Sequence, residues 1–126
     1  MGKKILIVDD EQDILMILKT RLEGSGYDVI AAANGEEGLS KALGEKPDLI
    51  ILDLMLPKVD GYWLCNIFKH DKRLPDVPII IVSARVTKQD VDTAKDCGAD
   101  AYFTKPFDSQ KLLLEVSRLL KKKKNP

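Results

Sequence analysis

The chain has 126 residues, the usual size of one domain, and its 44% hydrophobic and 32% charged residues are typical of a folded protein rather than a disordered or membrane-embedded one. Twenty basic and twenty acidic side chains cancel, so the net charge gives no indication of binding to nucleic acid or to an anionic membrane. No apolar run is long enough to cross a bilayer and the first residues lack a secretory signal, so we expect a cytoplasmic protein.

We expect a single domain over residues 1–126, with a folded core over about 3–120 and a basic tail or the start of a linker over 121–126. Only Cys65 and Cys97 are present. They lie far apart in apolar or helix-like sequence, so neither a disulfide framework nor a zinc site is expected.

Five short apolar runs, each too short for a typical helix, predict strands at residues 4–8, 28–32, 49–53, 79–83 and 101–104. The stretches that follow them have apolar residues at helical spacing, as at Ile14, Leu18 and Leu22, and predict five helices. Four residues are placed to accept hydrogen bonds from the first amides of a following helix: Asn34, Asp60, Thr87 and Asp108. Within the third helix, Trp63 and Phe68 are expected to pack inward.

A strict alternation of strand and helix predicts an α/β fold: a doubly wound, five-stranded parallel sheet with helices on both faces. The runs IIL and IIIV, apolar on both sides, fit strands buried on both faces. The expected strand order, 2-1-3-4-5, is that of flavodoxin-like proteins and does not follow from the residue pattern itself.

Ligands of such sheets bind beyond the carboxyl ends of the strands. Polar residues stand at four of these ends: Asp9 and Asp10 after the first strand, Asp53 at the end of the third, Ser83 at the end of the fourth and Lys105 after the fifth. Any one of these aspartates alone could be a helix cap or a turn former. Their joint occurrence at one edge of the sheet is harder to explain in that way, because charges at strand ends are costly unless they are paired or bound to a metal.

Three carboxylates close together raise one another's pKa unless a cation lies between them. Magnesium fits this site, because it prefers oxygen ligands and is usually held by one or two carboxylates together with phosphate oxygens. We expect Asp9 and Asp10 to be the metal-binding pair and Asp53, held rigidly after an apolar strand, to be the nucleophile that accepts a phosphoryl group. Lys105 and Ser83 suit the oxygens of the incoming anion.

The segments ILIVDDE (5–11), DLIILDLMLPKVDG (48–61), PIIIVSA (78–84) and GADAYFTKPF (98–107) resemble the receiver domains of two-component response regulators, over nearly the whole chain. The resemblance implies that Asp53 is phosphorylated by a sensor histidine kinase. It implies a magnesium ion bound by Asp9, Asp10, Asp53 and the main-chain carbonyl of Met55.

The same resemblance implies that Lys105 pairs with the phosphoryl group, that Ser83 reorients to bond one of its oxygens, and that Tyr102 moves as a coupled switch residue. An output domain or target protein would then bind the face formed by the fourth helix, the fifth strand and the fifth helix, and a homodimer is a further option. The domain itself is expected to bind neither nucleic acid nor membrane.

Three alternative functions share part of this residue pattern. A flavodoxin-like electron carrier binds the FMN phosphate after its first strand, where residues 9–13 of this chain are too acidic. A haloacid-dehalogenase-type phosphatase needs a second acid two residues after its nucleophile, and that position is Met55. We therefore expect a phosphoryl acceptor rather than an enzyme, with at most slow self-catalysed dephosphorylation. A non-phosphorylated interaction module of the same fold remains the third alternative.

Overall fold

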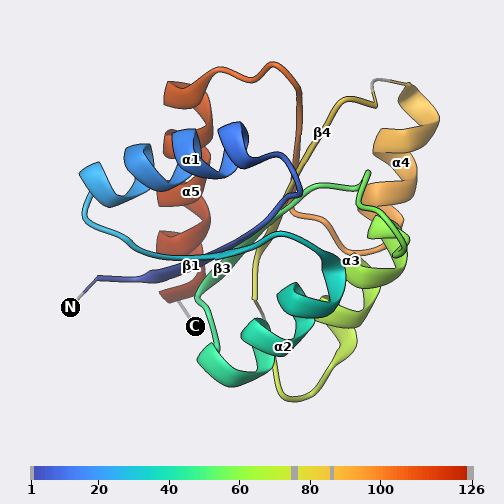
Figure 1. The fold of residues 1–126 in the computed structure, drawn as a ribbon, viewed down its shortest axis with the longest axis horizontal. Helices are drawn as coiled ribbons and strands as arrows, with labels where there is room; N and C mark the ends of the chain where they lie inside the picture. Colours follow the sequence, from blue (N-terminus) through green and yellow to red (C-terminus); the bar gives the residue numbers. More distant parts are fainter. Residues whose placement is uncertain (1, 75–76, 86, 125–126) are drawn as a thin grey trace.

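The computed structural model describes residues 2–74, 77–85 and 87–124, and over this part of the chain five strands alternate with five helices (Figure 1). The strands are β1 (Lys4–Val8), β2 (Asp28–Ala32), β3 (Leu49–Leu52), β4 (Ile79–Ser83) and β5 (Ala101–Thr104). The helices are α1 (Gln12–Gly24), α2 (Gly35–Glu45), α3 (Gly61–His70), α4 (Lys88–Asp96) and α5 (Ser109–Lys124).

All strands are parallel and form one sheet in the order β2-β1-β3-β4-β5. The predicted fold class and strand order are therefore confirmed. After β2 the chain crosses to the other side of β1, so that β1 and β3 are neighbours near the centre of the sheet. Because the strands are parallel, the carboxyl ends of β1, β3, β4 and β5 lie at one edge. In register, Val8 pairs with Leu52, which places the residues that follow these two strands side by side.

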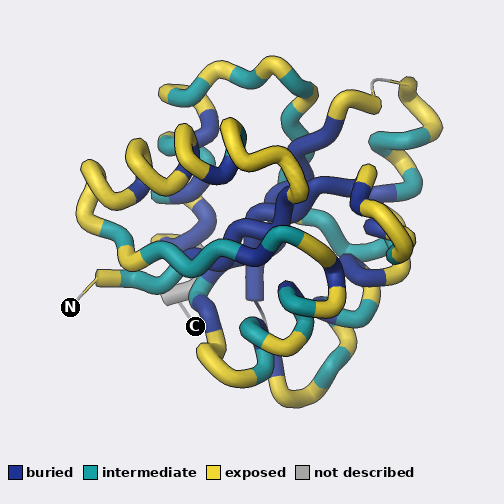
Figure 2. The backbone as a smooth tube through the Cα atoms, viewed as in Figure 1, coloured by how far each residue is buried: buried dark blue, intermediate teal, exposed yellow. Residues whose placement is uncertain are grey.

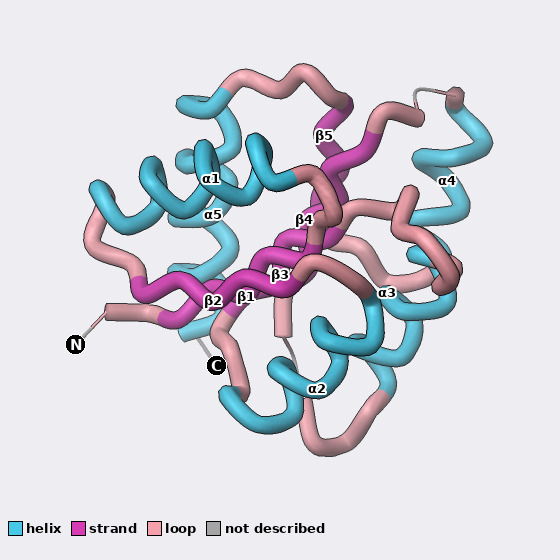
Figure 3. The backbone as a smooth tube through the Cα atoms, in the orientation of Figure 1, coloured by secondary structure: helices cyan, strands magenta, loops and turns pink. Residues whose placement is uncertain are grey.

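The central strands are buried on both faces because each face is covered by helices (Figures 2 and 3). On one face, Ile5, Ile7 and Ile51 pack against α1 and α5. On the other face, Leu6 and Ile50 pack against α2, α3 and α4. Alternating residues of each strand thus enter two separate apolar cores, as the continuous apolar runs indicated.

The four predicted helix caps are confirmed. Asn34, Asp60 and Thr87 each accept a hydrogen bond from an amide two or three residues ahead, at 2.8 to 3.1 Å. Asp108 accepts from Gln110 N at 2.9 Å. These bonds satisfy amides that have no partner inside the helix and so fix where each helix begins.

Three details differ from or extend the expectations. β3 ends at Leu52, so Asp53 lies just beyond the strand rather than within it. Trp63 is 53% exposed, and its predicted packing is wrong, whereas Phe68 is fully buried as expected. Cys65 is buried and Cys97 half-buried, and both are free thiols.

At the carboxyl end, α5 continues to Lys124, so the basic run begins as helix, and residues 125–126 of the predicted tail or linker lie outside the described residues. Within the part of the chain that the structure describes, no helix combines the length and the apolar character needed to span a membrane.

Candidate phosphoryl-acceptor site

The site lies where the chain leaves β1 and β3. The parallel ladder extends one residue past each strand, because Asp53 N donates to Val8 O at 2.9 Å and Asp9 N donates to Ala32 O at 3.1 Å. The backbone of both aspartates is therefore held by the sheet. A rigid strand end is a precise support for a reacting group, because the hydrogen-bonded ladder resists displacement.

Three predicted site residues meet here. Asp9, Asp10 and Asp53 can each offer one carboxylate oxygen, and these oxygens lie within 4.8 Å of one another. Asp9 is 2% exposed and Asp53 is 3% exposed, whereas Asp10 faces solvent. The two buried carboxylates are also fixed by backbone amides, since Glu11 N donates to Asp9 Oδ1 at 2.9 Å and Met55 N donates to Asp53 Oδ1 at 3.0 Å.

Lys105 joins the cluster from the loop after β5. Its Nζ lies 2.9 Å from Asp9 Oδ2, 3.1 Å from Asp53 Oδ2 and 2.8 Å from Glu11 Oε1. The peptide bond between Lys105 and Pro106 is cis. Sequence reasoning did not assign a role to Glu11, although its place in the run Asp-Asp-Glu was the one available signal.

The electrostatics of the cluster are unbalanced. The cluster contains one ammonium group and four carboxylates, those of Asp9, Asp10, Glu11 and Asp53, which leaves a formal excess of three negative charges among these described residues. Burial raises the pKa of Asp9, and the charge of Asp53 raises it further against the opposing effect of Lys105. Burial lowers the pKa of Lys105, but hydrogen bonds to Glu11 and Asp9 and the charge of Asp53 outweigh it, so that pKa is raised overall. The lysine is thus a permanent cation.

This donor set fits a hard divalent cation. The close oxygens are all carboxylates and one of the three residues is open to solvent, which matches a magnesium ion that keeps several waters. The single lysine does not offset the negative charge, so a bound cation would lower the repulsion between Asp9, Asp10 and Asp53. Met55 and Asp10 both line one surface groove, and the main-chain carbonyl of Met55 remains a predicted ligand.

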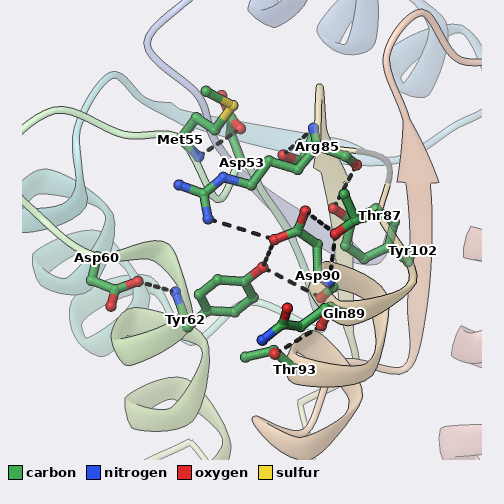
Figure 4. A network of polar contacts seen from close by, with 11 residues as sticks. Asp53, Met55, Asp60, Tyr62, Arg85, Thr87, Gln89, Asp90, Thr93 and Tyr102 are labelled. Atoms are coloured by element: carbon green, nitrogen blue, oxygen red, sulfur yellow. Dashed lines mark hydrogen bonds and ion pairs between the residues drawn. The ribbon is translucent and has the colours of Figure 1, made fainter.

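Ser83 lies at the end of β4 and Tyr102 lies within β5. Both are bonded to Arg85, and the bond from Tyr102 is drawn in Figure 4. The buried Ser83 hydroxyl oxygen accepts from Arg85 N at 3.2 Å, and the Tyr102 hydroxyl donates to Arg85 O at 2.8 Å. Burial raises the pKa of Tyr102, and a contact with Ser83 opposes that rise. In the structure these two predicted switch residues are therefore linked through the backbone of Arg85.

A groove of about 760 Å³ leads away from the carboxylates. Its walls include Asp10, Met55, Asp60, Tyr62 and Arg85, from the ends of β1 and β3, the start of α3 and the loop after β4. Asp10 belongs both to the groove wall and to the acidic cluster, so the groove opens beside the cluster that holds Asp53. Its position at the carboxyl ends of the central strands is the usual ligand site of a doubly wound sheet.

The chain is similar to known proteins over most of its length. The sequence model of the response regulator receiver domain matches residues 5–117. The chain is 46% identical over 122 residues to the alkaline phosphatase synthesis transcriptional regulatory protein PhoP of Bacillus subtilis, covering 97% of this chain and 50% of that protein. It is 44% identical to the DNA-binding dual master transcriptional regulator RpaA of Synechocystis, covering 94% of this chain and 49% of that protein.

Among solved structures, the chain is similar to a response regulator receiver domain protein (CheY-like) from Methanospirillum hungatei, with a TM-score of 0.89 and 35% identity over 97% of this chain and 96% of that one. The chain spans about half the length of the two curated relatives named above. The sequence and fold comparisons agree over nearly all of the chain, and the chain belongs to the response regulator receiver domain family.

Proposed function

We propose that this receiver domain is a phosphorylation-dependent signalling switch in which Asp53 accepts a phosphoryl group from a partner histidine kinase in the presence of Mg²⁺. One observation carries the proposal: a nearly fully buried carboxylate at a central strand end is held by Lys105 and by the Met55 amide, next to a second buried acid and an exposed one.

In the proposed reaction, a carboxylate oxygen of Asp53 attacks phosphorus and forms a P–O bond while the P–N bond to the phosphorylated histidine breaks. The electron pair of the broken bond stays on the imidazole nitrogen. Lys105, whose ammonium group already contacts Asp53 Oδ2, offsets negative charge on the transferring group. The hydroxyl of Ser83 is the proposed donor to one phosphoryl oxygen.

Magnesium would be held by Asp9, Asp10 and Asp53 with the carbonyl of Met55, and when bound it would supply positive charge that offsets the charge of the phosphoryl oxygens. Asp9 and the Glu11 amide that binds it fix the buried side of this site. Asp10 forms the open side, through which the donor enters. The proposed role of these residues is to hold the magnesium ion next to the Asp53 carboxylate.

The chain is proposed to be an acceptor and not an enzyme. A phosphatase with an aspartate nucleophile needs an acid two residues later, and Met55 offers no proton there. The phosphoryl group would persist on Asp53 apart from slow self-catalysed loss. Such a lifetime suits a signal, which must outlast the encounter with the kinase.

Phosphorylation is proposed to change the face formed by α4, β5 and α5, where an output domain or target protein would bind. Support comes from the bonds that join Ser83 and Tyr102 through Arg85, because a movement of the serine hydroxyl would alter a contact to β5. The two curated relatives bear the names of transcriptional regulators, so control of transcription is the proposed output. A homodimer and a cytoplasmic site of action remain predictions.

The proposal is tested by incubating the chain with acetyl phosphate and Mg²⁺ and measuring intact mass. The wild type should gain one phosphoryl group and Asp53→Asn none. The matched control is Asp28→Asn, which makes the same charge change at the exposed start of β2, at the opposite edge of the sheet. The control should be phosphorylated like the wild type. Equal uptake by Asp53→Asn would contradict the assignment, and no uptake by the wild type would favour the alternative of a non-phosphorylated interaction module.

A further inference from the structure

The carboxylate of Asp90, in the first turn of α4, joins three parts of the fold (Figure 4). Its Oδ1 accepts from the Tyr62 hydroxyl of α3 at 2.9 Å, and its Oδ2 accepts from the Thr87 hydroxyl at 2.6 Å. Arg85 Nη1 lies 3.7 Å from the same Oδ1. The hydrogen bonds from Thr87 and then from Tyr62 lower the pKa of Asp90, so the group is an anion at neutral pH.

Arg85 is the cation held by this carboxylate. Its guanidinium carbon lies 5.8 Å from the centre of the Tyr62 ring, a distance at which a cation is attracted to the face of an aromatic ring. The side chain is 45% exposed and forms part of the groove wall together with Asp10 and Met55. Among the described residues that line this groove, Arg85 is the one cation.

The main chain of Arg85 also reaches the predicted switch residues. Its N–H donates to Ser83 Oγ at 3.2 Å, and its carbonyl accepts from the Tyr102 hydroxyl at 2.8 Å. The side chain and the main chain of this residue therefore contact different groups. The side chain contacts Asp90 and Tyr62, whereas the main chain contacts Ser83 and Tyr102. Arg85 thus connects the groove wall, through its side chain, with the segment between Ser83 and β5, through its main chain.

We propose that Asp90, fixed by Tyr62 and Thr87, is a positioning residue that holds the Arg85 guanidinium in the groove wall, and that a phosphoryl group on Asp53 competes with Asp90 for this cation. The inference rests on the proposed function. Phosphorylation replaces the single charge of Asp53 by about two negative charges and presents oxygens that match the planar fork of an arginine. The existing ion pair is long and partly exposed, so it is weak enough to exchange.

Competition between Asp90 and the phosphoryl group for Arg85 predicts how a substitution of Asp90 changes binding at Asp53. If Asp90 withholds Arg85, neutralising Asp90 should strengthen the binding of a phosphoryl mimic at Asp53, and only while Arg85 is present. Asp90→Asn keeps the shape of the side chain and an oxygen acceptor for Thr87 or Tyr62. Asp92→Asn is the matched control, because Asp92 is exposed on the same helix and the substitution changes the net charge equally.

The test is a titration with beryllofluoride, a phosphoryl mimic, in saturating Mg²⁺, followed by the fluorescence of Trp63 and by amide NMR shifts. Asp90→Asn should bind beryllofluoride about two- to fivefold more tightly than the wild type, the range expected for a partly exposed ion pair. Asp92→Asn should bind like the wild type. In an Arg85→Gln background, adding Asp90→Asn should change the affinity no further.

Equal affinities of Asp90→Asn and Asp92→Asn would overturn the inference while leaving the proposed function intact. Tightening by Asp90→Asn that persists without Arg85 would also overturn it, because the effect would then not pass through the guanidinium. A wild type that binds no beryllofluoride in Mg²⁺ would overturn the proposed function and this inference together. Urea unfolding of each variant verifies that the compared proteins are folded.

Discussion

Replacing Asp10 by asparagine should stabilise the magnesium-free protein and remove most of the stabilisation that magnesium gives. The structure places an oxygen of Asp10 within 4.8 Å of oxygens of Asp9 and Asp53. Lys105 contacts the two buried acids and Glu11, so it offsets part of their charge. Asp10 therefore adds a negative charge to a cluster in which carboxylates already outnumber the one ammonium group.

The magnitude follows from the distance. Two unit charges about 5 Å apart repel by roughly 1 kcal/mol in water, and the aqueous value applies because Asp10 is exposed. Two such pairs, weakened by salt at physiological ionic strength, give a net gain of about 1 kcal/mol on neutralisation. For a domain of this size that free energy corresponds to a rise in Tm of about 3–5 °C.

The assay is thermal unfolding in EDTA and in excess Mg²⁺. Magnesium at ten times its Kd should stabilise the wild type by about 1.4 kcal/mol and Asp10→Asn by much less. Asp28→Asn, with the same charge change at the opposite edge of the sheet, controls for net charge. A lower stability of Asp10→Asn than of the wild type in EDTA would refute the predicted charge repulsion. An equal rise in the Tm of both proteins with magnesium would refute the predicted role of Asp10 in binding the ion.

Two further predictions concern packing and thiol chemistry. Gly61→Ala should destabilise the fold by about 1–3 kcal/mol in urea unfolding, because its Cβ would lie 2.5 Å from the carbonyl oxygen of Leu54, in the loop after Asp53. The control is Gly44→Ala, a substitution within α2 whose Cβ would meet no atom within 4 Å, so it should be neutral or stabilising. A loss of stability equal to that of Gly61→Ala would contradict the steric explanation. Burial raises the pKa of the Cys65 thiol to about 12, so little of it is the reactive thiolate at pH 8. Iodoacetamide should therefore label the partly exposed Cys97 first. Equal labelling rates in the native protein would count against the burial of Cys65.

Local signals predicted the elements well. Short apolar runs gave the five strands to within one residue, and helix caps such as Asn34 and Asp60 have the predicted hydrogen bonds. Both signals depend on neighbours in the sequence. Strand order depends on long-range pairing, and it came from analogy with known folds rather than from the residue pattern.

The candidate site was predictable for a related reason. In a parallel sheet every strand ends at the same edge, so Asp9, Asp10 and Asp53 had to lie near one another once the strand order made β1 and β3 neighbours. What could not be predicted were contacts set by side-chain reach. The bond from Lys105 to Glu11 and the bond from Tyr62 to Asp90 each depend on how loops and helices pack in three dimensions.

The predicted inward packing of Trp63 was wrong. A large aromatic residue in an amphipathic helix is usually expected to pack inward, yet Phe68 and Leu64 fill the inner face of α3 and leave Trp63 mostly outside. Helical spacing gives the faces of a helix, whereas the neighbouring elements decide how wide the buried face is.

The central claim, that Asp53 is the phosphoryl acceptor, is tested most directly by chemical trapping. After reaction with acetyl phosphate and Mg²⁺, borohydride reduces an aspartyl phosphate to homoserine, and peptide mass spectrometry then locates the changed residue. We predict homoserine at position 53, at a yield that falls when Mg²⁺ is removed by EDTA. Reduction at position 9 or 10, or no reduced residue in a chain whose intact mass shows phosphoryl uptake, would contradict the account.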